Sequence, residues 1–154
     1  MKKCRVKLKK LIVCEDQTRK TSWNVRMNLP IDQEQFEIVE GIIRSLRNIL
    51  GSYLIVELSE PLQKMTFLQM CRDNENLWRI ELHFEQPAIF SYKRNGRTYI
   101  RKHPWTQRLL HTNNVENAIQ VFRGILCDRD IPDLEAWKDC TKQIYMERFK
   151  RRQA

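Results

Sequence analysis

The sequence has too few glycines to build a phosphate-binding loop. Its four glycines are scattered along 154 residues, whereas such a loop needs several of them close together. No serine or cysteine stands in a G-x-S-x-G elbow, the strained turn that exposes a nucleophile. A cysteine and a histidine that are distant in the sequence can still meet in space, so catalysis is not excluded. With no catalytic motif present, we expect a protein that is not an enzyme and that uses no cofactor.

Long apolar runs are missing too. No run approaches the roughly 18 residues that a helix needs to cross a membrane. The N-terminus begins with lysines, as a signal peptide does, but the apolar run Leu11–Val13 is far too short to serve as its hydrophobic segment. We therefore expect a cytoplasmic protein without a membrane partner.

Cysteines at metal-binding spacing are absent as well. The five cysteines are an odd number, and they include no C-x-x-C pair and no Cys/His cluster with the spacing of a zinc site. Buried thiols are the expected state, and we expect no metal site.

What the chain does have is the composition of one folded domain. Hydrophobic residues make up 42% and charged residues 31%, which is too apolar for a disordered chain. A chain of 154 residues is long enough to bury a core. We expect a single α+β domain over residues 1–154, with a frayed C-terminus from about residue 150.

The first half predicts four strands around one helix. Apolar residues alternate over 4–13 and 21–29, and β-branched or apolar residues fill 52–58 and 64–71. Between them, Asp32 is a suitable N-cap, and apolar residues recur at helical spacing from Phe36 to Leu50. Gly51 is expected to end this helix.

The second half predicts a strand, a hairpin and two helices. In residues 77–84, Trp78 and every second residue after it face one way, and Pro87 ends the strand. A hairpin follows over 88–102, because Asn95-Gly96 favours a turn with two positive φ angles. A helix capped by Thr112 or Asn113 follows, with an apolar face from Val115 to Leu126. A loop then leads to a last helix, and Leu134, Trp137, Ile144 and Tyr145 are expected to dock this segment on the domain.

These elements predict an α+β fold with a largely antiparallel sheet and two main helices packed on it. In its core we expect the apolar face of residues 77–84 to pack against both helices. The expected core residues are Trp78, Ile80, Leu82, Phe84, Phe36, Ile43, Phe122 and Ile125.

The net charge of +9 is unevenly distributed along the chain. Residues 1–30 carry 9 basic and 2 acidic side chains, residues 31–90 carry 5 and 10, and residues 91–154 carry 14 and 7. A bias of this size favours an anionic partner.

The stretch YKRNGRTYIRKHPW, residues 92–105, contains no acidic residue and holds five Lys or Arg. On a hairpin, Arg97, Tyr99 and Arg101 share a face, so two guanidinium groups flank one ring. Three interpretations stay open: a surface for phosphates and bases, a surface for an acidic protein, and an edge hairpin kept soluble by its charge. The candidate partner-binding residues are Lys93, Arg94, Arg97, Tyr99, Arg101, Lys102 and Trp105. We expect Arg94, Arg97, Arg101 and Lys102 to be exposed.

A second candidate site is the row Glu81, His83 and Glu85. On a strand these three side chains share one face, where they are able to bind a metal or exchange protons. The alternative is an ordinary solvent-facing strand with alternating polar residues.

Residues 76–139 resemble small bacterial immunity proteins of polymorphic and contact-dependent toxin systems. The resemblance lies in the segments NLWRIELHFEQPAIFSY, TNNVENAIQVFRGIL and IPDLEAWKD. The residues that match the family pattern are Ala118, Ile119, Phe122, Leu126 and Trp137.

This resemblance implies a protein that binds a cognate toxin in the producing cell and neutralises it. Many immunity proteins against nucleases are acidic, whereas this chain is basic, so we expect its toxin to offer an acidic face. The alternative is a nucleic-acid-binding module, although the sequence shows no RNP-like pattern, KH loop, zinc finger or helix-turn-helix. A small enzyme that uses Glu81, His83 and Glu85 is a third possibility.

Overall fold

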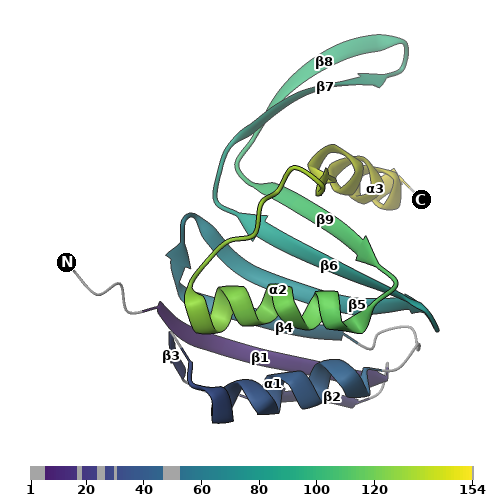
Figure 1. Cartoon of the computed structure of the whole chain (residues 1–154). Coiled ribbons are helices and arrows are strands. Elements are labelled where there is room, and N and C mark those ends of the chain that lie inside the picture. The colour runs from purple at the N-terminus through teal and green to yellow at the C-terminus, as the bar shows by residue number, and fades with distance from the viewer. Residues whose placement is uncertain (1–5, 17–18, 24–26, 30, 47–52, 154) are drawn as a thin grey trace.

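The computed structural model describes residues 6–16, 19–23, 27–29, 31–46 and 53–153 (Figure 1). Within them the chain forms an antiparallel sheet with helices, which confirms the α+β class. In chain order the elements are β1 (Val6–Asp16), β2 (Arg19–Trp23), β3 (Met27–Leu29), α1 (Gln33–Ser45), β4 (Tyr53–Leu62), β5 (Met65–Asn74), β6 (Leu77–Phe84), β7 (Ala88–Arg94), β8 (Arg97–His103), β9 (Thr106–Thr112), α2 (Val115–Asp128), β10 (Lys138–Asp139) and α3 (Thr141–Gln153).

The large sheet has the strand order β10-β9-β6-β5-β4-β1-β2, and β3 also pairs with β1. All its pairs are antiparallel. Strands β7 and β8 pair only with each other within the described residues and rise beyond the large sheet as a hairpin (Figure 1).

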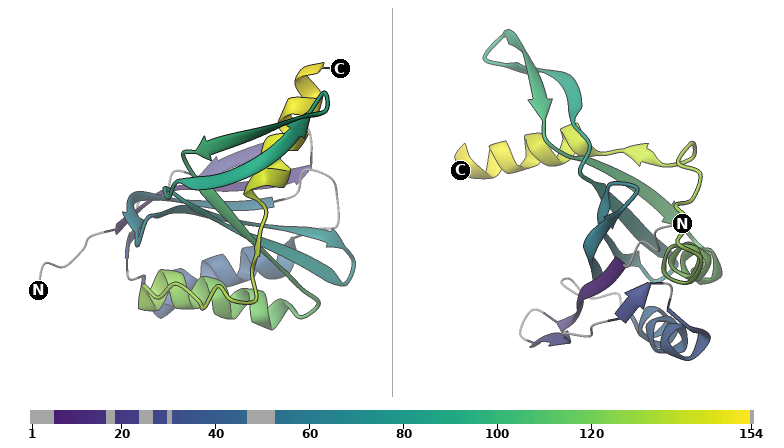
Figure 2. Two further views of the ribbon diagram at one scale, coloured as in Figure 1. Left: turned by 90° about the horizontal axis from the view of Figure 1, so that it is seen from above. Right: turned by 90° about the vertical axis from the view of Figure 1, so that its left-hand side faces the viewer.

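The helices lie on both faces of the sheet. Helices α1 and α2 lie side by side on one face, whereas α3 lies on the opposite face next to the hairpin (Figure 2). The sheet with two main helices packed on it, as the sequence predicts, therefore describes one side of the molecule, and α3 adds a partial layer on the other.

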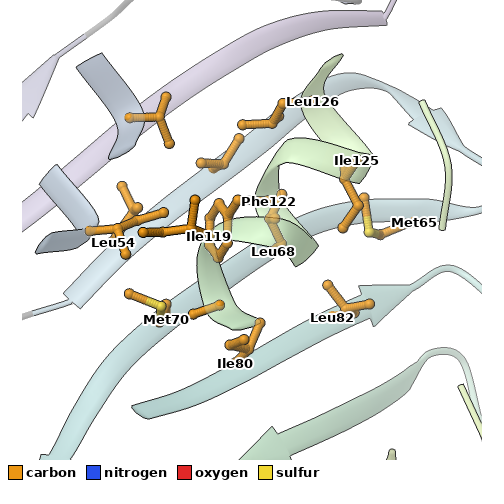
Figure 3. Close-up of a cluster of buried hydrophobic side chains, with 14 of the residues drawn as sticks. Leu54, Met65, Leu68, Met70, Ile80, Leu82, Ile119, Phe122, Ile125 and Leu126 are labelled. Carbon is orange, nitrogen blue, oxygen red and sulfur yellow. The ribbon is translucent and has the colours of Figure 1, made fainter. Parts of the chain in front are cut away.

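The hydrophobic core lies between the sheet and the pair α1 and α2 (Figure 3). Ile80 and Leu82 of β6 are fully buried there, beside Phe36 of α1 and Phe122 of α2. The predicted core is confirmed with one difference: Trp78 is half-buried, because it lies near the end of β6 and packs against the edge of the core.

The N-cap of α1 is Asp32, as its sequence predicts, and Asp32 forms a capping box with Gln35. The Asp32 carboxylate accepts a hydrogen bond from the Gln35 backbone N–H at 2.8 Å, and the Gln35 side chain accepts one from Asp32 at 3.1 Å. The helix ends at Ser45, because its C-cap Leu46 has a non-helical ψ of 126°. The expected continuous helix to Leu50 is therefore wrong, and the expected stop at Gly51 lies outside the described residues.

The hairpin turn is also as predicted. Asn95 and Gly96 both have positive φ, 51° and 74°, which is the backbone of a two-residue turn that matches the twist of its strands. By contrast, the strand expected over 21–29 is described as β2 and β3, which both pair with β1, and Val25 lies outside the described residues.

The second half differs from the sequence-based expectations in two places. Residues 103–111, between the expected hairpin and helix, were interpreted as a loop, but Thr106–Thr112 forms β9 and pairs with β6 along its whole length. The cap of α2 is Asn114, not Thr112 or Asn113, since the Asn114 side chain accepts a hydrogen bond from the Glu116 N–H at 2.9 Å. Thr112 ends β9, so the chain needs two more residues to turn into the helix.

Truncation of Phe122 tests the packing between α2 and the sheet. Phe122→Ala is expected to lower the free energy of unfolding by about 3–5 kcal/mol, because the fully buried ring would leave a cavity. Urea denaturation measures this loss. Gln120→Ala, on the exposed face of the same helix, is the control and should change it by less than about 0.5 kcal/mol.

Candidate functional site

The β7–β8 hairpin, residues 88–103, is referred to below as the arm. Directly paired residues point to the same side of a hairpin, and successive residues alternate. One face, the inner face, therefore carries Phe90, Tyr92, Arg94, Arg97, Tyr99, Arg101 and His103. The other, the outer face, carries Ile89, Ser91, Lys93, Thr98, Ile100 and Lys102.

The inner face is held to α3 by aromatic contacts around Tyr145. The Tyr145 ring lies 5.6 Å from the ring of Phe90 and 5.4 Å from that of Tyr92, and the Arg101 guanidinium lies 4.4 Å above it. Tyr92 in turn stacks on Tyr99 at 5.5 Å. Offset and edge-to-face rings and a cation over a ring are each favourable, so this cluster fixes the direction of the arm.

His103 lies at the base of the arm and is buried. Arg101 Nε donates a hydrogen bond to His103 Nδ1 at 3.1 Å, so Nδ1 carries no proton and the neutral ring bears its proton on Nε2. Among the described residues, Nε2 is buried without a hydrogen-bond partner. The ring makes an edge contact with Trp105 at 4.2 Å.

The surroundings of His103 favour its neutral form. Burial lowers the pKa of His103 below its ordinary value, and the positive charges of Arg101 and Arg148 lower it further. Burial also lowers the pKa of His83, which stacks on Phe67 at 4.4 Å. The base of the arm therefore contains two histidines that resist protonation.

The outer face of the arm is exposed along its length and includes two large aliphatic side chains. Ile89 is 73% exposed and Ile100 is 80% exposed, more than any other large hydrophobic side chain that the structure describes. Lys93 and Lys102 lie on the same face and are exposed. This face is an apolar patch bordered by positive charge.

The arm and α3 are both strongly basic. Residues 88–105 carry five Lys or Arg and no acid, and residues 141–153 carry five and one. Residues 1–30 are also basic, with 9 basic and 2 acidic side chains, but acidic residues elsewhere offset them, so the chain outside the arm and α3 has 18 of each sign. The arm and α3 lie side by side in Figure 2, so their positive charge is gathered in one region.

The predicted partner-binding residues come together with two exceptions. Lys93, Arg94, Arg97, Tyr99 and Lys102 are exposed on the arm. Arg101 was expected to be exposed but is half-buried, because its guanidinium lies over Tyr145 and its Nε bonds to His103. Trp105 is half-buried at the base of the arm, away from the turn.

The partner-binding residues predicted from the sequence do not include several residues of the arm and of α3. Ile89 and Ile100 lie on the outer face, and the alternation of the hairpin would have placed them there. Tyr145 and Arg148 of α3 support the inner face and Trp105, and no local sequence signal connects them to the hairpin.

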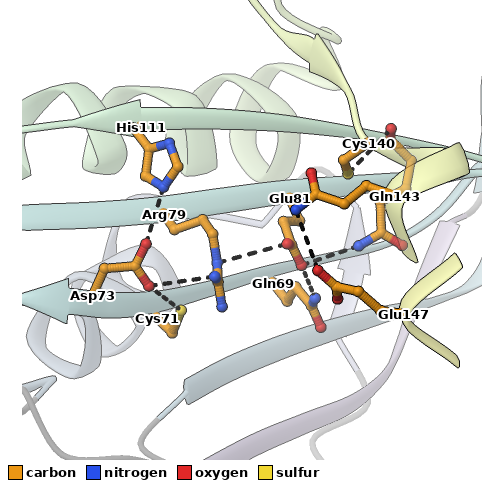
Figure 4. Close-up of polar contacts among 10 residues, drawn as sticks. Gln69, Cys71, Asp73, Arg79, Glu81, His111, Cys140, Gln143 and Glu147 are labelled. Carbon is orange, nitrogen blue, oxygen red and sulfur yellow. Dashed lines mark hydrogen bonds and ion pairs between the residues drawn. The ribbon is translucent and has the colours of Figure 1, made fainter. Parts of the chain in front are cut away.

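A polar network covers the face of the sheet opposite α1 and α2 (Figure 4). Pairing places Cys71, Arg79 and His111 side by side across three strands. Asp73 accepts a hydrogen bond from His111 at 2.9 Å and forms an ion pair with Arg79 at 3.4 Å. These groups are partly exposed, so their pairing adds little stability.

The row Glu81, His83 and Glu85 is not assembled as one site. The Glu81 carboxylate accepts hydrogen bonds from the side-chain amides of Gln69 and Gln107, the latter at 3.0 Å. His83 Nδ1 lies 3.2 Å from Gln107 Oε1. The part of the chain that the structure describes contains no group of three or more His, Cys, Asp or Glu placed to hold a metal ion.

A pocket of about 310 Å³ lies between α3 and this polar face. Glu81 and Gln107 line its sheet side, and their polar groups already bond to each other. Its lining residues are Phe67, Gln69, Glu81, Gln107, Ile144, Glu147 and Arg148.

The described cysteine side chains are free thiols. Cys140 is buried, and Cys71 and Cys127 are half-buried. Burial raises the pKa of Cys71 and of Cys140 to about 11, so both stay protonated at neutral pH and are poor nucleophiles. Cys4 lies outside the described residues.

Comparison of the chain with protein-family models, with curated proteins and with solved structures finds no match. Within the described residues, no helix is both long enough and apolar enough to cross a membrane.

Acidification is expected to loosen the arm from α3. A histidine whose folded pKa is depressed binds a proton more readily when released, so its contribution to stability is complete above about pH 6.5 and falls below it. Amide protection factors in residues 88–103, which correct the exchange rates for their intrinsic pH dependence, should therefore fall between about pH 7 and pH 5. His103→Phe should reduce this fall in protection, whereas His111→Gln, at an exposed histidine outside the cluster, should keep it. An equal fall in protection in wild type and His103→Phe would contradict the assignment.

Proposed function

We propose that the chain is a protein-binding module that acts without catalysis and uses the arm as its interface. The observation that carries this proposal is the outer face, where Ile89 and Ile100 are 73% and 80% exposed beside Lys93 and Lys102. An apolar patch with a charged border is typical of a protein interface.

The two isoleucines supply the expected gain in free energy. Covering a large aliphatic side chain is worth roughly 1.5–3 kcal/mol, so both together contribute several kcal/mol when a partner covers them. A phosphate backbone offers nothing to these side chains, whereas an apolar patch on a protein does. The apolar part of the surface therefore favours a protein partner.

The charge specifies the kind of protein. The arm has no acidic residue between 88 and 105, so it repels another copy of itself and attracts an acidic surface. Helix α3 lies beside it and adds to the same positive field. The partner that fits is a protein with an acidic face and an apolar centre.

Within this class, the proposed role is that of an immunity protein. It would bind a cognate toxin in the cytoplasm of the producing cell and cover the surface that the toxin needs. The support for this role is the resemblance of residues 76–139 to such proteins and the lack of a catalytic motif in the sequence. The arm belongs to the resembling region and projects from the sheet, as an interface element does.

The immunity role is tested by the gene beside this one. The C-terminal domain of a secreted protein encoded immediately upstream is expected to arrest growth when produced inside cells, and this chain should restore growth. The two purified proteins should bind each other directly. Absence of a toxic neighbour, or arrest that this chain does not relieve, would contradict the role.

Charge reversal on the outer face tests the interface. Lys93→Glu with Lys102→Glu should lower the association rate with that toxin domain by about tenfold or more and weaken its salt dependence. Thermal stability should stay nearly constant, since both lysines are exposed. Lys64→Glu with Lys138→Glu makes the same change in net charge at exposed sites outside the arm, and it should leave most of the rate intact.

Nucleic acid is the second candidate partner. Tyr92 and Tyr99 stack on each other, and the exposed Arg94 and Arg97 follow them toward the turn, so rings for bases lie next to charges for phosphates. Binding of this kind would weaken steeply with salt. We predict that mixed single-stranded RNA and DNA are not retained in a filter assay at about 150 mM salt. Retention at this salt that Arg97→Glu abolishes would favour nucleic acid over protein.

A further inference from the structure

The arm has an unpaired backbone edge along β8. Around a two-residue turn the flanking residues, here Arg94 and Arg97, form a hydrogen-bonded pair, and such pairs alternate along the hairpin. The N–H and C=O groups of Thr98, Ile100 and Lys102 therefore point away from β7. Within the described residues no strand pairs with this edge, and no other backbone group bonds to it.

The side chains along this edge select what can pair with it. Lysine and arginine on an edge strand prevent pairing with strands of like charge. Residues 97–102 include Arg97, Arg101 and Lys102 and no acid, so the edge rejects a second arm but attracts an acidic strand. Residues Arg97–Ile100 are all exposed, which leaves room for an added strand.

We propose that β8 receives an extended acidic segment of the protein partner as an added antiparallel strand. This inference rests on the proposed function and specifies how the arm recognises its partner. Backbone hydrogen bonds to Thr98, Ile100 and Lys102 hold the segment, and its side chains select the register. Acidic residues fit opposite Arg97, Arg101 and Lys102, and apolar residues fit opposite Tyr99 and Ile100.

The segment that fits has a definite order. Because the added strand is antiparallel, its chain runs from the residue opposite Lys102 to the one opposite Arg97. The pattern is acidic, acidic, apolar, aromatic, neutral, acidic. A synthetic peptide with the core Glu-Glu-Val-Tyr-Thr-Glu is the probe.

The control is the same peptide with N-methyl groups on the three residues that lie opposite Thr98, Ile100 and Lys102. These groups keep the charge and the side chains but remove the N–H donors that face β8. We expect the unmodified peptide to bind the full chain at least about tenfold more tightly, because two or three hydrogen bonds are lost with methylation. Amides of Thr98, Ile100 and Lys102 should gain protection from exchange on binding.

A proline in the arm gives an independent test in the protein itself. Ile100→Pro removes an outward N–H that β7 does not use, and it should weaken binding of the unmodified peptide more than Ile100→Ala does. Ser91→Pro removes an outward N–H on the opposite edge and should leave binding intact. Circular dichroism and thermal unfolding check that the domain is folded in each variant.

Equal affinity for the two peptides, or no binding of the unmodified peptide, would overturn strand addition. Other results would overturn the proposed function: a toxin domain that does not bind, or a charge reversal on the arm that leaves the association rate unchanged. If the toxin domain binds through the arm while Thr98, Ile100 and Lys102 stay unprotected, the interface is correct and the added strand is wrong.

Discussion

Strand β6 lies between β5 and β9, and the alternation of its side chains divides the molecule in two. Ile80 and Leu82 face α1 and α2 and are fully buried, whereas Arg79, Glu81 and His83 face the opposite side. A shift of one residue in its register would exchange the two sets and place charge in the core. The helical core on one side and the polar support for α3 and the arm on the other both depend on this register.

The arm depends on the polar face of the sheet, where α3 lies. A two-stranded hairpin alone is marginally stable in water, so an arm that projects beyond the sheet needs contacts at its base. Tyr145 supplies these contacts, because its ring contacts Phe90, Tyr92 and Arg101. The inner face is used for this support, which leaves the outer face and the β8 edge available to a partner.

Local signals predicted much of the fold. Asp32 caps its helix with its own side chain, and Asn95 and Gly96 form the turn with their own positive φ angles, so both features could be predicted from the sequence. Strand β9 was missed because Leu109 and Leu110 stand next to each other in TQRLLHT and hide the alternation. In the sheet Leu110 packs against the core, whereas Leu109 points to the opposite face.

The candidate site was predicted only in part, because the sequence shows composition and local pattern but not contacts between distant residues. Its charge is a property of composition, so the basic stretch was visible without a structure. The burial of Arg101 was not, because it comes from Tyr145, which is distant in the sequence and reaches the arm only when α3 folds onto the sheet.

The most direct test of the arm as an interface is hydroxyl-radical footprinting of the chain in complex with the toxin domain that we propose as its partner. Ile89 and Ile100 should lose reactivity on binding, while Ile38, 51% exposed on α1, should keep it. Loss of reactivity at Ile38 with none at the arm would contradict this interface.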